Sequence, residues 1–278
     1  MGFRAYIRML RITHTLFSLP FAYVGALAAG LKDPVDALMI GVALFSARSV
    51  AILSNDLFDR DLDSYNPRTS GRPLVTGEAR PSVVASLIVV FSFIFSLAAL
   101  YFNWLAFFLS FPILVAELSY PFAKRVHCFP HLHLGAILGA SPLAGAIAIS
   151  GSLERLPWGY SIALALWVAG FDVIYSLQDV EFDRKFAVRS IPACFGESAA
   201  LNVAAIMHLS SFLILVITSA VGLISLISII SYGFLLLIEN IKARMGKYKE
   251  AFDLNIVIGL LLGLGVMSDY LVQRPLGG

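Results

Sequence analysis

The stretch that decides how this chain folds and works is Asn55-Asp56-Leu57-Phe58-Asp59-Arg60-Asp61-Leu62-Asp63. It places five charged groups and one amide at the end of a long apolar run. Asn55, Asp59 and Asp63 follow i, i+4, i+8 spacing and would share one face of a helix, with Asp56 beside them. Carboxylates this close repel one another and take up protons unless a cation holds them together. Mg²⁺ prefers such oxygen ligands, so the stripe suggests an enzyme that handles a diphosphate.

The composition identifies the environment in which the chain folds. Of its 278 residues, 59% are hydrophobic and only 14% are charged. A soluble domain of this size carries more charge, so we predict a polytopic membrane protein. Backbone groups in lipid must be paired within their own segment, which makes the fold all-α. The net charge of +2 and the absence of a basic-aromatic pattern give no indication of nucleic-acid binding.

Apolar windows long enough to cross a bilayer predict nine transmembrane helices. The windows are Thr15–Leu31, Val35–Phe58, Ser82–Tyr101, Trp104–Tyr120, Leu132–Ser150, Tyr160–Gln178, Leu201–Ala220, Val221–Glu239 and Phe252–Leu271. The turn between the seventh and eighth windows is marked only by Gly222 and small neighbours. Basic residues before the first window resemble the start of a signal peptide, but with so many later spans we interpret it as an uncleaved helix.

The distribution of positive charge orients these spans. Sixteen of the 20 Lys and Arg residues fall in segments on one side and three on the other, while Arg48 lies inside a helix. The positive-inside rule then places the N-terminus and both acidic stretches in the cytoplasm and the C-terminus outside. We therefore expect an integral protein of the cell (inner) membrane with its active site on the cytoplasmic side.

Two cytoplasmic loops are longer than the others in this single transmembrane domain of residues 1–278. Residues 64–81 and 183–200 are both rich in turn signals such as Pro and Gly. Loops of this length often act as caps over a site, although two solvated basic loops would look the same. Cys128 and Cys194 are far apart and show no metal-ligand spacing, so we expect two unpaired thiols.

A second acidic stretch closes the sixth predicted helix. Asp179 and Asp183 are spaced i, i+4, and Tyr175 extends the same stripe by one turn. Asp172, seven residues before Asp179, lies close to that stripe. Like the first stretch, this one joins an amide to an Asp, ends a helix and precedes a basic loop. We expect the two carboxylate sets to face each other across a cavity and to hold two Mg²⁺ ions. The alternative is that the acids only mark the polar ends of two helices.

Arg48 is a charged residue inside an apolar helix, seven residues before Asn55 and on the same face. A charge at the centre of a membrane helix costs about 2.5–3.5 kcal/mol, so it should face a cavity and have a partner. Arg48 would bind the diphosphate or the carboxylate of an acceptor. A structural ion pair with an Asp of the same site is the alternative.

Other basic and aromatic residues extend this set of candidates. They are Lys124, Tyr120, Arg68, Arg72 and His14. Lys124 can reach a diphosphate as a point charge, although positive-inside anchoring explains it as well. A further cluster consists of His127, His131 and His133, which we interpret as interfacial because the spacing matches no metal motif.

Together these motifs resemble the UbiA superfamily of intramembrane aromatic prenyltransferases over nearly the whole chain. The resemblance rests on NDxxDxxxD at Asn55–Asp63, DxxxD at Asp179–Asp183 and YxxxK at Tyr120–Lys124. It also includes residues 66–72. Residues 14–21 look most like the 4-hydroxybenzoate polyprenyltransferase branch and its menaquinone-pathway relatives.

The resemblance implies nine helices around a central cavity that opens sideways to lipid and is capped by the two loops. It implies Mg²⁺-dependent ionisation of an allylic polyprenyl diphosphate, followed by attack of an aromatic acceptor such as 4-hydroxybenzoate. The metal and diphosphate would be placed by Asn55, Asp56, Asp59, Asp63, Asp179 and Asp183. Lys124, Arg68 and Arg72 would stabilise the leaving group. Tyr175 and Asp172 would line the acceptor side, with Arg48 holding acceptor or diphosphate. No obligate protein partner is evident.

Two alternatives remain at this point. Some relatives transfer the prenyl group to a non-aromatic acceptor, geranylgeranylglyceryl phosphate. A different class, a cation-coupled transporter, would place its acids near the bilayer midplane at broken helices. Here they cluster at the cytoplasmic helix ends, with only Asp172, Asp269 and Glu117 as deeper acids, which favours the enzyme.

Overall fold

The computed structural model describes residues 3–11, 19–219 and 222–272, and within these ranges all regular structure is helical. Eight helical segments are long and apolar enough to cross a membrane. They are α4 (Pro34–Phe58), α6 (Pro81–Phe102), α7 (Trp104–Val126), α8 with α9 (Pro130–Gly139 and Ser141–Ser150), α10 (Trp158–Ser176), α13 (Glu197–Thr218), α14 (Leu223–Arg244) and α15 (Tyr248–Val272). These segments match eight of the nine predicted windows.

The first predicted window, Thr15–Leu31, lies partly outside the described residues. Its described part forms α3 (Leu19–Ala28), an apolar helix of 10 residues. The membrane-spanning, all-helical fold is therefore confirmed, while the count of nine spans stays a prediction. A short helix, α1 (Phe3–Met9), precedes it.

Local signals in the sequence determine where several spans begin and break. The Asp33 side chain accepts a hydrogen bond from the Val35 backbone N–H, and Pro34 occupies the first turn, so α4 starts there. The side chain of Asn103 caps α7 in the same way. The fifth predicted window is divided at Ala140 into α8 and α9. Pro142, in the first turn of α9, cannot continue the hydrogen-bond ladder of α8.

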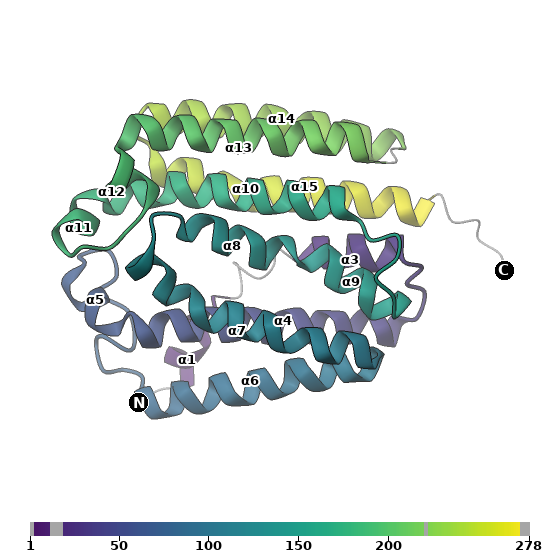
Figure 1. Ribbon diagram of the computed structural model, residues 1–278, viewed down its shortest axis with the longest axis horizontal. Helices are drawn as coiled ribbons and strands as arrows, with labels where there is room; N and C mark the ends of the chain where they lie inside the picture. Colours follow the sequence, from purple (N-terminus) through teal and green to yellow (C-terminus); the bar gives the residue numbers. More distant parts are fainter. Residues whose placement is uncertain (1–2, 12–18, 220–221, 273–278) are drawn as a thin grey trace.

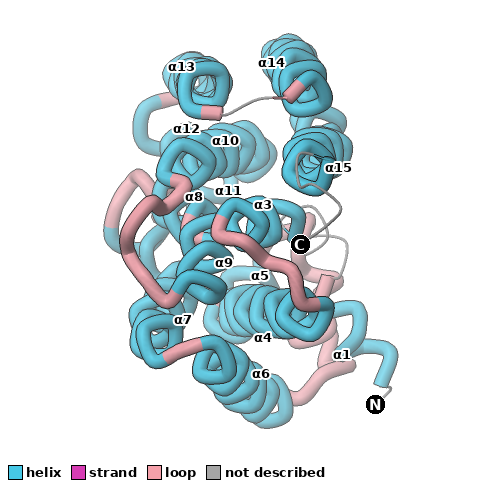
Figure 2. Tube along the Cα trace, turned by 90° about the vertical axis from the view of Figure 1, so that its right-hand side faces the viewer, coloured by secondary structure: helices cyan, strands magenta, loops and turns pink. Residues whose placement is uncertain are grey.

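The helices run side by side along the long axis of the molecule (Figure 1). Viewed along the bundle, α3, α8 and α9 lie between one group formed by α4, α6 and α7 and another formed by α10, α13, α14 and α15 (Figure 2). Helix α10 contacts α8, α13 and α15. Its Trp167 is 0% exposed and donates a hydrogen bond to Asn255 of α15 (Nε1–Oδ1, 2.7 Å). The helix that carries the second acidic stretch is thus anchored in the core.

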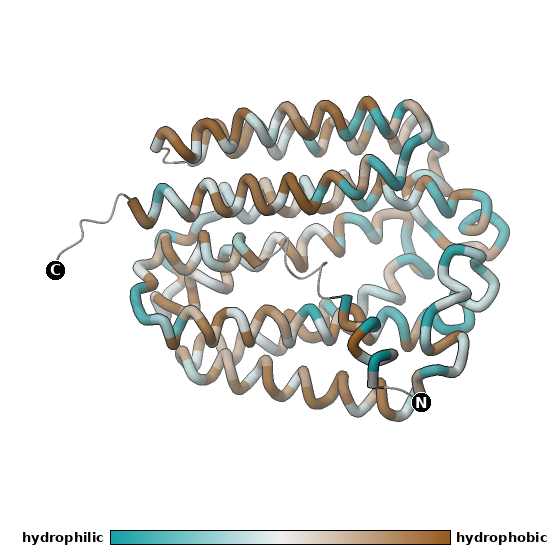
Figure 3. The backbone as a smooth tube through the Cα atoms, turned by 180° about the vertical axis from the view of Figure 1, so that it is seen from behind, coloured by the Kyte–Doolittle hydropathy of each residue, from teal (hydrophilic) through white to brown (hydrophobic). Residues whose placement is uncertain are grey.

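Polar and apolar residues separate along the bundle. The helix surfaces are mostly apolar, whereas hydrophilic residues gather at the end formed by three short helices, which we call the polar end (Figure 3). These helices are α5 (Arg60–Tyr65), α11 (Val180–Lys185) and α12 (Ile191–Phe195). Large side chains such as Phe93, Phe108 and Phe234 are well exposed along the spans. Such surfaces are stable in lipid, so the chain is an integral membrane protein.

The two expected cap loops differ in structure. Residues 66–80 form a series of turns and end where Pro81 starts α6. The second segment is shorter than expected as a loop, because α12 lies within residues 183–200 and α13 begins at Glu197. We call these the first cap (residues 64–81) and the second cap (residues 183–200).

Neither acidic stretch lies on one uninterrupted helix. Helix α4 ends at Phe58, and α5 resumes at Arg60 after Asp59. The second stretch passes from α10 through a 3-10 turn, Leu177–Asp179, into α11. The first stretch still keeps helical hydrogen bonds across Asp59, from the Asp59 N–H to the Asn55 carbonyl (3.0 Å) and from the Asp63 N–H to the Asp59 carbonyl (2.8 Å). The predicted i, i+4 relation of these residues is therefore retained in the backbone, whereas the second stretch changes to a 3-10 turn before Asp183.

The expectation of two unpaired thiols is also wrong. Cys128 and Cys194 form a disulfide with a Cα–Cα distance of 6.2 Å, across a sequence separation of 66. The loop after α7 packs against α12 at the polar end, and the Phe129 and Phe195 rings lie beside the bond, 5.8 Å apart between centroids. Sequence spacing contains no information on this contact, because it is made by tertiary packing.

Candidate active site

A cavity of about 730 Å³ lies under the two caps at the polar end. It is lined from α1, α4, α5, α7, α8, α10, α11, α15 and both caps. Twelve of the predicted site residues line it: Arg48, Asn55, Asp56, Asp63, Arg68, Arg72, Tyr120, Lys124, Asp172, Tyr175, Asp179 and Asp183. Asp59 is not among the lining residues, and His14 lies outside the part of the chain that the structure describes.

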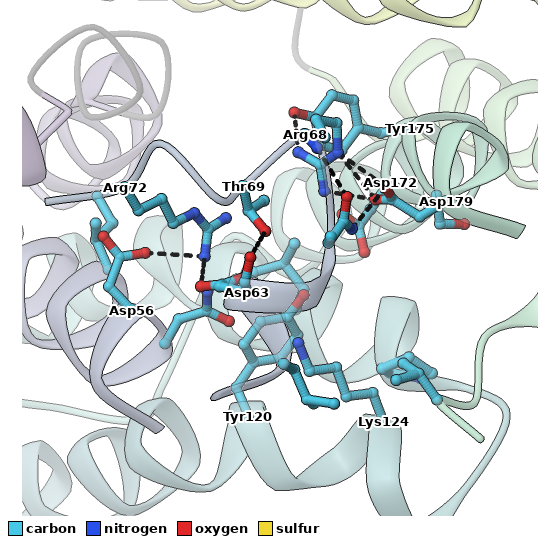
Figure 4. A pocket seen from close by; sticks show the side chains of 18 of the residues that line it. Asp56, Asp63, Arg68, Thr69, Arg72, Tyr120, Lys124, Asp172, Tyr175 and Asp179 are labelled. Carbon is cyan, nitrogen blue, oxygen red and sulfur yellow. Dashed lines mark hydrogen bonds and ion pairs between the residues drawn. The ribbon is translucent and has the colours of Figure 1, made fainter. Parts of the chain in front are cut away.

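Asp56 and Asp63, from the first acidic stretch, converge on Arg72 of the first cap (Figure 4). Arg72 Nη1 lies 2.5 Å from Asp63 Oδ2 and 3.2 Å from Asp56 Oδ1. Asp56 is 1% exposed, and its Oδ1 also accepts from Arg11 Nη2 at 2.6 Å. Its buried Oδ2 has no hydrogen-bond partner among the described residues. A buried carboxylate oxygen without a partner is costly, so this atom is suited to a cation.

Asp59 makes a separate set of contacts and is not among the residues that line the cavity. Its carboxylate is bound to Lys124 Nζ, and Arg125 Nη2 lies 3.5 Å from its Oδ1. Asp59 is 1% exposed, whereas the Lys124 side chain is 25% exposed, so the pair has one buried and one partly exposed member. Lys124 itself lines the cavity. The observed contact of Asp59 is therefore with the cation of α7, which it holds in place.

The second acidic stretch is bound by the first cap. Arg68 donates from Nε (3.0 Å) and Nη2 (2.5 Å) to Asp179 Oδ2, and from Nη1 to the Tyr175 hydroxyl (2.8 Å). Asn66 also donates to Asp179, at 3.0 Å. Burial is the largest single influence on Arg68 and opposes its charge, but the hydrogen bond to Asp179 and the charges of Tyr175, Asp179 and Asp63 together outweigh it and raise the pKa of Arg68. The first cap thus connects the two acidic stretches across the cavity.

Asp183 is bound within the second cap. Its Oδ2 accepts from Ser190 Oγ at 2.8 Å, and the same hydroxyl accepts from the Ala193 backbone N–H at the start of α12. Ser190 therefore caps a helix and orients a carboxylate. The serine carries no motif in the sequence, so its role was not predictable.

His131 is a further site residue that sequence reasoning missed. It is buried in the first turn of α8, and its Nδ1 lies 2.7 Å from Asp172 Oδ2. Both residues line the cavity. This position differs from the interfacial one that the sequence predicts for His127, His131 and His133. His127 is exposed, and His133 contacts the carbonyl of Ala116 at 2.9 Å, so the three do not act together.

The deep wall of the cavity adjoins a second, apolar cavity of about 470 Å³. Arg48 and Leu138 line both spaces. Arg48 is almost fully buried, and its Nε has no hydrogen-bond partner within the described chain. Glu117, at the apolar cavity, is 2% exposed and its Oε2 is likewise unpartnered in those residues. Arg48 therefore lies where the polar and apolar spaces meet, and Glu117 lies within the apolar one; both have an atom without a hydrogen-bond partner in the described residues.

The donor set fits a hard divalent cation, although no group of three or more His, Cys, Asp or Glu residues in the described ranges forms a metal site by itself. Residues of both acidic stretches line one cavity, and among the described residues the buried Asp56 Oδ2 has no hydrogen-bond partner. Mg²⁺ uses few protein carboxylates and takes its other ligands from water or phosphate oxygens. A bound diphosphate would supply the metal ligands that these carboxylates do not, and the surrounding arginines would bind its other oxygens.

The fold and this cavity define a class: an integral membrane protein with a cavity lined by carboxylates and arginines at one end of a helical bundle. The sequence model of the UbiA prenyltransferase family matches residues 18–258, and the chain belongs to this family of prenyltransferases.

The relatives agree with this assignment. The chain is 31% identical to a protein of Aeromonas hydrophila named 4-hydroxybenzoate octaprenyltransferase, with 96% of each chain covered. A protein of the same name from Yersinia enterocolitica is 30% identical, again with 96% of each covered. Among solved structures, the apo structure of a UbiA homolog from Aeropyrum pernix K1 has a TM-score of 0.87 and 38% identity, covering 92% of this chain and 98% of that one.

A more distant structure shares the fold. It is a UbiA homolog from Archaeoglobus fulgidus bound to GPP and Mg²⁺, with a TM-score of 0.70 and 19% identity, covering 95% of this chain and 99% of that one.

Proposed function

We propose that this protein transfers an isoprenyl group from an allylic polyprenyl diphosphate to an aromatic acceptor such as 4-hydroxybenzoate, with Mg²⁺ as cofactor. The observation that carries the proposal is the cavity in which both acidic stretches and the arginines of the first cap meet, beside an apolar space. The names of the relatives from Aeromonas hydrophila and Yersinia enterocolitica support the aromatic acceptor.

On the donor side, the acidic residues hold metal and diphosphate. The proposed ligands are Asn55, Asp56, Asp63, Asp179 and Asp183, with Asp59 acting through Lys124. Mg²⁺, when bound, neutralises diphosphate oxygens and so favours departure of the leaving group. Arg68, Arg72 and Lys124 are now paired with carboxylates and lie at the cavity, ready to turn to the diphosphate. Cations placed where negative charge develops lower the barrier to ionisation.

The apolar cavity is proposed to receive the isoprenyl chain. Its lining is apolar apart from Arg48, Glu117, Ser110 and Ser141. Small residues such as Ala47 and Ala144 give it width. An amphiphilic donor needs adjoining polar and apolar spaces, and here they share Arg48 and Leu138.

On the acceptor side, Arg48 binds the carboxylate of the acceptor, and Tyr175 and Asp172 line the space around its ring. When the C1–O bond of the donor breaks, its electron pair leaves with the diphosphate. A ring carbon of the acceptor then forms a bond to C1. The ring loses the proton on that carbon, and the C–H electron pair restores aromaticity. Asp172, a carboxylate on the cavity wall, accepts this proton.

The test is diphosphate release and product formation by the purified protein in lipid nanodiscs. Donors of increasing chain length are combined with 4-hydroxybenzoate or geranylgeranylglyceryl phosphate, with and without Mg²⁺. We expect a prenylated aromatic product only when Mg²⁺ is present. Transfer to geranylgeranylglyceryl phosphate alone would overturn the aromatic acceptor, and no transfer with any pair would overturn the function.

The membrane and its orientation belong to the same proposal. We propose that the polar end, with the active site and the N-terminus, faces the cytoplasm of a cell (inner) membrane. The excess of basic residues on this side supports that orientation. Protease accessibility of the first cap in inside-out but not right-side-out vesicles would agree with it, and the reverse pattern would contradict it.

A further inference from the structure

We propose that His131 is a positioning residue for the acceptor step, which holds Asp172 in place as proton acceptor and is itself held by the second cap. This inference rests on the proposed function. It goes beyond that function because it assigns a role to a residue outside both acidic motifs, and it links that role to closure of the cap.

The contacts of His131 determine which of its ring nitrogens carries the proton. The backbone N–H of Ile191, at the start of α12, donates to His131 Nε2 (N–N distance 3.3 Å). A peptide N–H can only donate, so Nε2 must be the unprotonated nitrogen. In the neutral ring Nδ1 then carries the hydrogen and donates it to Asp172 Oδ2 at 2.7 Å. The cap therefore selects the tautomer that serves Asp172.

This hydrogen bond leaves one oxygen of Asp172 for the substrate. Asp172 lines the cavity, with its side chain 17% exposed, and Oδ1 accepts no hydrogen bond within the described residues. His131 also lines the cavity but is only 2% exposed, and its Nδ1 contacts Asp172, so we infer that it acts on the acceptor through Asp172 (Figure 4 labels Asp172, Tyr175 and Asp179). A carboxylate held at one oxygen keeps the other in a constant orientation, which proton transfer from a bound acceptor needs.

The hydrogen bond between Ile191 and His131 forms only when the second cap is docked against the helices. Ile191 follows directly after Ser190, whose hydroxyl orients Asp183. The Arg189 backbone N–H donates to the Lys124 carbonyl at 2.7 Å. One short segment therefore contacts the acidic stretch on the donor side and His131 on the acceptor side. When it is in place, both halves of the site are ordered together.

The disulfide ties the same two segments together. Cys128 lies three residues before His131, and Cys194 lies three residues after Ile191. The disulfide thus joins the same two segments as the hydrogen bond between Ile191 and His131. It limits how far α12 can move away from the start of α8.

Three substitutions of His131 separate its two hydrogen bonds. In His131→Asn the amide nitrogen takes the place of Nδ1 and can still donate to Asp172. In His131→Gln the amide oxygen takes the place of Nε2 and can still accept from Ile191, but the donor to Asp172 is lost. His131→Ala removes both. His127→Ala is the matched control, because His127 is an exposed histidine of the same segment.

The experiment measures two quantities for each variant in nanodiscs: the kcat of transfer to 4-hydroxybenzoate and the Kd of the donor with Mg²⁺. We expect His131→Ala and His131→Gln to lower kcat about 10²-fold, the scale of a proton-transfer contribution. Donor Kd should change less than about twofold. The kcat of His131→Asn should be at least about tenfold higher than that of His131→Gln, because His131→Asn keeps the donor to Asp172 on which proton transfer depends. The control should behave as wild type.

A double mutant tests whether the two residues act as one unit. Asp172→Asn combined with His131→Gln should be no slower than Asp172→Asn alone, because residues that work through each other are not additive. Equal kcat in His131→Gln and wild type would overturn the proposal, as would a loss of donor affinity as large as the loss of kcat. A multiplicative double mutant would also overturn it.

Failure of a variant to fold, failure of the proposed function and failure of the role of His131 can be told apart. If His131→Ala does not fold, the comparison of His131→Asn with His131→Gln still decides the question, since both fill the buried site. If wild type transfers no isoprenyl group to any aromatic acceptor, the proposed function has failed. If wild type is active and the Asn and Gln variants are equally active, only the role of His131 has failed.

Discussion

Arg68 and Asp179 form an ion pair across the cavity, with Nη2 and Oδ2 2.5 Å apart, although 111 residues separate them in the sequence. The arginine comes from the first cap and the carboxylate from the end of the sixth predicted helix. In the proposed complex this ion pair is broken. The guanidinium of Arg68 then binds a phosphate oxygen, and the carboxylate of Asp179 binds the metal. The pair therefore occupies the place where donor and cofactor are proposed to bind.

Removing one carboxylate from either stretch should abolish turnover. We expect Asp56→Ala and Asp179→Ala to lower diphosphate release at least about 10²-fold, because each removes an electrostatic contact to the charged donor. Asp61→Ala is the control, since Asp61 belongs to the same stretch but is exposed and does not line the cavity. Full activity of Asp56→Ala or Asp179→Ala, in protein with the elution volume and Tm of wild type, would contradict a metal site formed by both acidic stretches.

Arg68→Lys should not replace the arginine. The guanidinium can make a forked contact with phosphate oxygens of the kind it makes here with Asp179, and an ammonium group cannot reproduce that geometry. We expect kcat to fall about 10-fold or more, given that charge-assisted forked bonds are worth more than single ones. Steady-state kinetics with a fixed acceptor measures it. A lysine variant with wild-type kcat would mean that Arg68 contributes only its charge.

Chelation of Mg²⁺ should stop turnover. It should also abolish the increase in thermal stability of the protein that the bound donor gives. A ligand at 100 times its Kd stabilises a protein by about 2.7 kcal/mol, so geranylgeranyl diphosphate with Mg²⁺ should raise Tm. With EDTA the same diphosphate should leave Tm nearly unchanged. This readout does not depend on catalysis. An equal rise in Tm with EDTA would show that arginines alone bind the donor.

Ala144→Phe should shift the preferred donor to shorter chains. Ala144 lines the apolar cavity, and a ring at that position would fill part of its 470 Å³. We expect kcat/KM for geranyl diphosphate to stay within about threefold while that for long donors falls about 10-fold, the scale of a lost apolar contact. Ala136→Phe, on the exposed side of α8 and away from both cavities, should have no such effect. An unchanged chain-length profile in Ala144→Phe would place the isoprenyl chain elsewhere.

Loss of the disulfide should loosen the polar end. Closing a loop of this length stabilises a protein by about 2–4 kcal/mol, so Cys128→Ser should lower Tm. A reductant should lower the Tm of wild type toward that of the variant and leave Cys128→Ser unchanged. Differential scanning fluorimetry in detergent measures both. A Tm unaffected by either treatment would show that packing of Phe129 on Phe195 holds the cap without the covalent bond.

The sequence alone determined the helical membrane fold and named most of the carboxylates and cations that line the cavity. Long apolar runs can only be satisfied as helices in lipid, and this property is local, so eight of the predicted spans agree with the described structure. The two acidic stretches were likewise visible because their carboxylates are neighbours in the chain. Lys124, Arg68 and Arg72 were named as cations for the same site, and all three line the cavity.

Only the tertiary structure decided which groups face each other. The bond between Cys128 and Cys194, the contact of His131 with Asp172 and the turning of Asp59 toward Lys124 all join segments that are distant in sequence. Spacing rules describe side chains on one helix, whereas these pairs depend on how caps and helix ends pack together at the polar end. Composition and periodicity hold no record of such packing, because it depends on the free energy of the whole folded chain and not on any one segment.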